Sequence, residues 1–105
     1  MQTPDVIQAH IREGLLRLET YMASWVTDHL IQPRLISVQE SDDKEKIMQM
    51  WLVTDHTGDN DASLRIVFDE KSGLFGHEFL AESPKQCSLL LELISEDFAE
   101  VVQAM

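Results

Sequence analysis

The apolar residues of the first thirty positions recur at steps of three and four, which is the spacing of one face of an α-helix. Thr3, Pro4 and Asp5 form a helix start, because threonine caps, proline suits the first turn and the acid faces the positive end of the helix dipole. Pro33 cannot continue a helix, so the sequence predicts one helix from Thr3 to about Leu30. Its apolar stripe consists of Ile7, Ile11, Leu15, Leu18, Met22, Trp25 and Val26.

The end of the chain has a second pattern of this kind. Ser83, Pro84 and Gln86 match a capping box with proline at the first helical position, which predicts a helix that begins there. Its apolar stripe consists of Leu90, Leu91, Ile94, Phe98, Val101, Val102 and Met105. Gly14 interrupts the first stripe at a cost of about 1 kcal/mol relative to alanine, so we expect another element to approach the first helix closely at that point.

Between these two predicted helices the pattern is that of β-strands. Four apolar, β-prone segments are separated by short polar or glycine-containing connections. The segments lie at residues 35–38, 47–54, 64–68 and 75–79. Glu70–Gly73 reads as a tight hairpin turn in which Gly73 can take a positive φ. Short connections favour an antiparallel order of the strands.

These patterns predict an α+β fold that forms a single domain over residues 1–105. The expected order is α-β-β-β-β-α, an antiparallel four-stranded meander with the N- and C-terminal helices packed on one face. A chain of this length buries roughly two-thirds of the surface that it exposes when unfolded, so it can form a core without disulfides or bound metals. Cys87 is the single cysteine, which rules out an intrachain disulfide and a cysteine-cluster zinc site.

The charge balance is the unusual property of this composition. Eight Lys and Arg stand against nineteen Asp and Glu, which gives a formal net charge of −11. Binding to a nucleic-acid backbone or to an anionic membrane requires a basic surface, so neither is expected as a partner. The chain has no secretory leader pattern and no apolar run of the roughly 20 residues that span a membrane, which predicts a cytoplasmic location.

Acidic residues repeat on the second predicted helix. Glu92, Glu96 and Glu100 recur every four residues opposite the apolar stripe, with Asp97 beside them. Like charges at this spacing repel one another, and acids near a helix C-terminus oppose the dipole. An acidic face retained at that cost predicts a binding surface for a protein partner with a basic surface, and a merely solvated face is the alternative.

A second seam lies on the first predicted helix. Ala9, Leu16, Ala23 and Leu30 are spaced by seven residues, roughly opposite the main stripe. Alternation of small and large residues at this spacing suits a helix–helix contact, so Ala9, Leu16 and Ala23 are candidate residues of a homodimer interface.

Residues suited to metal binding occur in one polar segment. Hard oxygen ligands are offered by Asp55, Asp59, Asn60 and Asp61, with His56 as a further candidate ligand. Their spacing does not match a calcium-binding EF-hand loop. A solvated hairpin loop explains the same composition, so we expect no metal and no cofactor.

Catalytic residues form no recognisable set. His77 alternates with Phe75 and Phe79, which is typical of a hydrogen-bonded core or rim histidine, and Cys87 lies on an apolar stripe. No nucleophile elbow, phosphate-binding loop or zinc-binding histidine motif occurs.

The sequence therefore favours a small, acidic, non-enzymatic protein-binding module that acts as an adaptor, chaperone or inhibitor-like protein. In size, charge and mixed α/β content the chain is similar to small acidic chaperones of bacterial secretion systems and to toxin-neutralising immunity proteins, and no sequence motif carries that similarity. The alternatives are a dimeric structural subunit and a divalent-metal-dependent sensor or enzyme that uses the Asp55–Asp61 loop.

Overall fold

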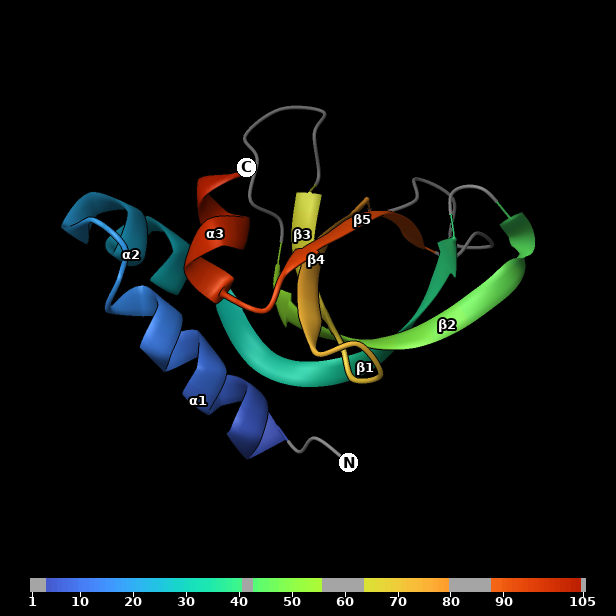
Figure 1. The fold of residues 1–105 in the computed structure, drawn as a ribbon, viewed down its shortest axis with the longest axis horizontal. Helices are drawn as coiled ribbons and strands as arrows, with labels where there is room; N and C mark the ends of the chain where they lie inside the picture. Colours follow the sequence, from blue (N-terminus) through green and yellow to red (C-terminus); the bar gives the residue numbers. More distant parts are fainter. Residues whose placement is uncertain (1–3, 41–42, 56–63, 80–87, 105) are drawn as a thin grey trace.

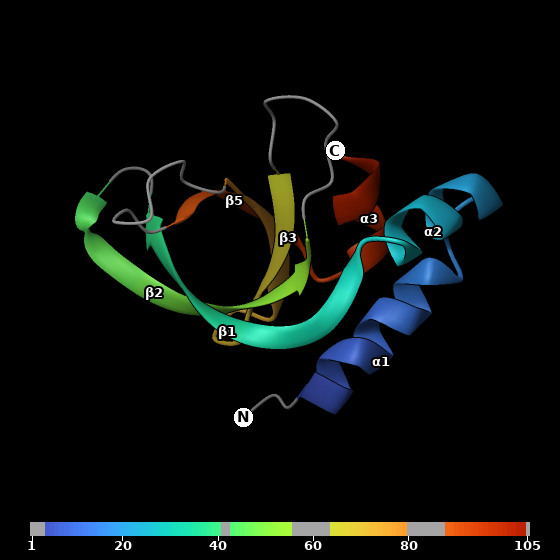
Figure 2. The same cartoon turned by 180° about the vertical axis from the view of Figure 1, so that it is seen from behind.

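The computed structural model describes residues 4–40, 43–55, 64–79 and 88–104 (Figure 1). Three helices lie within these ranges: α1 (Pro4–Leu15), α2 (Thr20–Thr27) and α3 (Phe98–Gln103). The strands are β1 (Leu30–Glu40), β2 (Asp43–Thr54), β3 (Leu64–Asp69), β4 (Leu74–Phe79) and β5 (Ser88–Ser95). The strands curve into a closed barrel, and the helices gather together at one end of the molecule (Figures 1 and 2).

The barrel follows the order of the chain, β1-β2-β3-β4-β5, and consecutive strands are antiparallel. It closes where Val38–Glu40 of β1 runs parallel to Ser88–Leu90 of β5. This closing pair is parallel because an odd number of alternating strands leaves the first and last strands pointing the same way. The predicted antiparallel four-stranded meander is therefore wrong: all four predicted strands form, but a fifth converts the open sheet into a closed mixed barrel.

The fifth strand occupies part of the segment predicted as the second helix. Residues 88–95 form β5, and only Phe98–Gln103 is helical; the predicted helix start at Ser83–Gln86 lies outside the described residues. A short, leucine-rich apolar run fits a buried strand as well as a helix, so periodicity alone could not separate the two. Pairing with β4 on one side and β1 on the other gives this segment hydrogen bonds along both edges, and that tertiary context decides its structure.

The predicted first helix is also wrong in its length, because the chain breaks into α1 and α2 over residues 16–19. Glu19 is extended, with φ −62° and ψ 150°. A straight helix over the predicted range would be about 40 Å long, whereas the whole molecule measures 38 × 35 × 21 Å. The break lets Val26 of α2 enter the same apolar cluster as Ile7 and Ile11 of α1.

Two apolar clusters lie on the two faces of the curved sheet. The larger one fills the space between the helices and the outside of the barrel and contains Ile7, Ile11, Leu18, Val26, Val53, Ile66, Phe68, Phe75, Phe98, Ala99, Val101 and Val102. The smaller one contains Val38, Met50, Leu52, Val67 and Leu90, which belong to four strands. The prediction of helices packed on one face of an open sheet is thus corrected: the second face is the lining of the barrel.

An ion pair joins β3 and β4 inside the barrel. Arg65 and Glu78 lie directly opposite each other in the strand register, and the Nε of Arg65 donates to Oε1 of Glu78. The Glu78 side chain is fully buried, and 8% of the Arg65 side chain is exposed. The second carboxylate oxygen of Glu78 has no hydrogen-bond partner among the described residues.

Helices α1 and α3 meet at Gly14. A Cβ atom at this position would lie 2.7 Å from Cβ of Phe98 and 3.0 Å from the backbone nitrogen of Ala99, so only glycine allows the two helices to approach this closely. The close approach predicted at Gly14 is confirmed, and so is the positive φ of Gly73, which is 74° in the β3–β4 turn. None of the described helices is long and apolar enough to cross a membrane.

Candidate functional site

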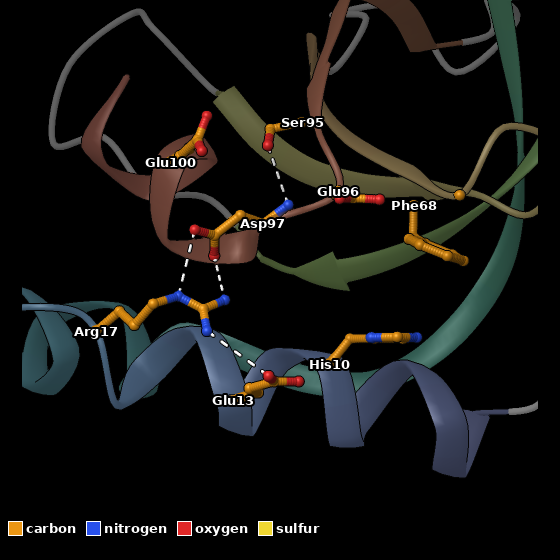
Figure 3. Close-up of a pocket in the computed structure, with 9 residues that line it drawn as sticks. His10, Glu13, Arg17, Phe68, Ser95, Glu96, Asp97 and Glu100 are labelled. Carbon is orange, nitrogen blue, oxygen red and sulfur yellow. Dashed lines mark hydrogen bonds and ion pairs between the residues drawn. The ribbon is translucent and has the colours of Figure 1, made fainter.

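A pocket of about 550 Å³ lies between α1, the β3–β4 turn and the junction of β5 with α3 (Figure 3). Segments from both ends of the chain therefore form its walls. The residues that line it are His10, Glu13, Arg17, Phe68, Gly73, Ser95, Glu96, Asp97 and Glu100. Four of these carry carboxylates and one carries a guanidinium, so the pocket is strongly acidic.

Arg17 and Asp97 form the central contact of this pocket. Nη2 of Arg17 lies 2.6 Å from Oδ1 of Asp97, and Nε donates to Oδ2 at 3.3 Å (Figure 3). The planar guanidinium matches both carboxylate oxygens, which fixes the direction as well as the distance of the contact. This hydrogen bonding lowers the pKa of the Asp97 carboxyl and raises the pKa of Arg17, in each case against an opposing effect of desolvation.

Local hydrogen bonds hold Asp97 in place at the start of α3. Its Oδ1 accepts from the backbone N–H of Ala99 at 3.0 Å, which makes Asp97 the N-cap of α3. Its own backbone N–H donates to Oγ of Ser95 at 3.0 Å. Because these bonds fix the turn from β5 into α3, they also fix the backbone of Glu96 and Glu100 beside the pocket.

Negative charge exceeds positive charge around the Arg17 guanidinium. Oε1 of Glu13 lies 3.7 Å from Nη1 of Arg17, so this guanidinium is shared between Glu13 and Asp97. Glu96 and Glu100 are exposed and form no ion pair with any residue in the described part of the chain. The pocket therefore has two carboxylates that an additional cation can approach.

One wall of the pocket is made of rings. The imidazole of His10 lies roughly parallel to the ring of Phe68, with centroids 6.3 Å apart and an angle of 23° between the planes. Phe68 itself is buried, whereas His10 is exposed. His10 and Phe68 therefore give the pocket an aromatic wall beside its carboxylates.

The structure brings three of the four predicted partner-binding acids to this pocket. Glu96, Asp97 and Glu100 line it, whereas Glu92 is an exposed residue of β5 and does not. The expectation that these acids share one face of a helix is wrong, because Glu92 lies in a strand and α3 begins only at Phe98.

Sequence reasoning did not find the residues that α1 and its following turn contribute. His10, Glu13 and Arg17 stand about eighty positions before their neighbours in the pocket. No local spacing indicates such a contact. Gly14 is the one indirect signal, because its close approach to Phe98 brings α1 against the start of α3.

The residues predicted for a dimer seam do not form one stripe, because the helix that would carry them is broken. Ala9 on α1 is exposed, Leu16 is 87% exposed in the turn after α1, and Ala23 on α2 is half-buried against the larger apolar cluster. Leu16 and Ala23 nevertheless border the same groove between α1 and α2.

The remaining candidate residues do not gather into a site. Oδ1 of Asp55 lies 3.1 Å from Nδ1 of His29, which is hydrogen-bond distance. The rest of the Asp55–Asp61 loop and Cys87 lie outside the described residues. His77 is buried, and its Nε2 donates to the carbonyl oxygen of Val101 at 2.9 Å, so of the core and rim positions predicted for His77 the structure has the core one. Within the described ranges no three His, Cys, Asp or Glu residues lie close enough to hold a metal ion.

Comparison with protein-family models, with curated proteins and with solved structures finds no match to this chain. The interpretation of the pocket therefore depends on its own geometry and charge.

Proposed function

We propose that the chain is a non-enzymatic binding module of the cytoplasm, an adaptor, chaperone or inhibitor-like protein, and that its acidic pocket receives a lysine or arginine side chain of a basic protein partner. The observation that carries this proposal is the guanidinium already present there. Arg17 shows that carboxylates of this pocket hold a cationic side chain in a two-point contact, and Glu96 and Glu100 are left to hold a second one.

The shape of the pocket suits a long cationic side chain. Lysine and arginine have an apolar stem that packs against a ring and a charged end that stays near carboxylates and water. In this pocket the stem would lie along the imidazole of His10, and the charged end would lie near Glu96 and Glu100. A neutral side chain would leave these carboxylates without a partner. An acidic side chain would also be repelled by them.

The charge of the whole chain supports the same class of partner. A net charge of −11 attracts a basic protein over distances longer than any single contact, so association is fast and weakens as salt screens the charges. The pocket would then decide where on the acidic molecule the partner docks.

The proposal is tested with the full chain and two labelled peptides, one that alternates lysine and arginine with serine and one in which glutamate replaces every basic residue. Fluorescence anisotropy at low and high salt measures their binding. We expect the basic peptide alone to bind, and we expect E96Q/E100Q to raise its dissociation constant by about tenfold, which corresponds to about 1.4 kcal/mol.

Glu92→Gln is the control, because it removes an exposed carboxylate from β5, outside the pocket. This variant should change the dissociation constant by no more than about twofold, since an isolated exposed charge contributes little. If E92Q weakens binding as much as E96Q or E100Q does alone, the attraction is general and the pocket has no special role. Failure of the basic peptide to bind at low salt would contradict the proposal altogether.

A further inference from the structure

An apolar groove of about 440 Å³ lies in the angle between α1 and α2. Leu15, Leu16 and Leu18 form one side of it. The other side is a face of α2 made of small residues at helical spacing, Thr20, Ala23, Ser24 and Thr27. The Thr27 hydroxyl donates to the carbonyl oxygen of Ala23 at 2.6 Å, so its proton is already used within the helix. Because all four side chains are short, this face allows close approach by an apolar side chain.

Leu16 stands beside this groove and projects into solvent. At 87% exposure it is the most exposed of the large apolar side chains in the described part of the chain. A projecting leucine and a groove that fits apolar groups lie on one surface. Two copies of such a surface, related by a two-fold axis, place each leucine in the groove of the other copy.

The charges next to the groove would also complement those of a second copy of the same surface. A smaller hollow of about 210 Å³ adjoins the groove, since Leu15 lines both. Arg12 borders the smaller hollow and Asp28 borders the groove, and neither forms an ion pair within the described part of the chain. When a surface with a cation on one side and an anion on the other meets its own copy across a two-fold axis, opposite charges face each other.

We propose that this surface is the interface of a homodimer, in which Leu16 of each copy enters the α1–α2 groove of the other and Arg12 of each copy faces Asp28 of the other. A second copy fits better than a basic partner because the charges that border these hollows balance. They contrast with the four carboxylates and one guanidinium of the acidic pocket. The dimer does not depend on the function proposed for that pocket.

Sedimentation velocity of the full chain from micromolar to millimolar concentration tests the proposal. We expect a concentration-dependent dimer and expect L16D to raise its dissociation constant at least about tenfold, as is usual for a central apolar contact. R12E and D28K should each weaken the dimer, and R12E/D28K should recover most of the loss, because the double reversal exchanges the two charges across the axis.

Leu35→Asp is the matched control, since Leu35 is 52% exposed on β1 and lines neither hollow. The L35D variant should dimerise like the unmodified chain. Thermal melting of every variant checks that the fold persists. A chain that stays monomeric at millimolar concentration overturns the proposal, as does an L16D variant that dimerises normally. Absence of recovery in R12E/D28K contradicts the two-fold arrangement.

Discussion

Two arginine–carboxylate pairs in this molecule have the same chemistry and opposite surroundings. Arg65 and Glu78 face each other across β3 and β4 inside the barrel, with side chains 8% and 0% exposed. Arg17 and Asp97 meet in the wall of the acidic pocket, with side chains 48% and 23% exposed. The first pair joins neighbouring strands, whereas the second joins residues eighty positions apart.

The difference lies in what each pair contributes. A buried pair must compensate the loss of water around both charges, so removal of one partner leaves an uncompensated charge in the core. A surface pair is screened by water and contributes little to the free energy of unfolding. We infer that loss of either Arg65 or Glu78 alone destabilises the barrel, and that Arg17 and Asp97 mainly position the groups around the pocket.

The largest expected effect comes from the buried pair. Glu78→Gln keeps the shape of the side chain and removes its charge, so the free energy of unfolding should fall by about 3–5 kcal/mol. The double variant R65M/E78L removes both charges and should recover most of that loss, because one oxygen of Glu78 lacks a partner among the described residues in any case. Urea unfolding measures the free energy of unfolding of both variants. A double variant as unstable as E78Q would show that the pair itself is stabilising.

A smaller effect is expected where α1 meets α3. In an exposed helix Gly→Ala is stabilising by about 1 kcal/mol. At Gly14 the added Cβ would collide with Phe98 and Ala99, so G14A should instead destabilise the protein by about 1–3 kcal/mol. The shift should also loosen the contact between Arg17 and Asp97 while the barrel remains intact. Thermal melting measures the loss of stability, and circular dichroism of the strands shows whether the barrel remains intact. A stabilised G14A would contradict the observed packing.

The smallest effect is expected at the surface pair. Asn is as good an N-cap as Asp, so D97N should cost less than about 1 kcal/mol, whereas D97A loses the cap as well and should cost about 1 kcal/mol more.

The dependence on pH isolates the ionic part of this contact. The Arg17 contact lowers the pKa of Asp97, so its stabilisation is fully present above the ordinary carboxyl pKa of 3.8 and is lost as the pH falls through the lowered value. Melting temperatures of the unmodified chain and D97N should therefore converge in strong acid. A constant difference between them at every pH would show that the ion pair contributes nothing.

Much of the barrel could be predicted from the sequence. The start of α1 at Pro4, the four strands β1 to β4 and the glycine of the β3–β4 turn follow from local patterns, and the structure has them. Gly14 correctly indicated a close contact on α1. The acids Glu96, Asp97 and Glu100 were singled out for an incorrect reason, since the first two lie in the turn between β5 and α3 and the third in the first turn of that short helix.

Local sequence determined which segments of this chain are apolar, where turns fall and how strongly acidic the surface is, because each of these depends on neighbours a few residues apart. Tertiary structure alone decided that residues 88–95 form a strand, that the first helix breaks, and that Glu13 and Arg17 meet Glu96 and Asp97. The physical reason is that a leucine-rich segment satisfies its backbone and buries its side chains in either conformation, so the sheet edges available to it make the choice. The pocket exists only once that choice has placed the end of the chain against its beginning.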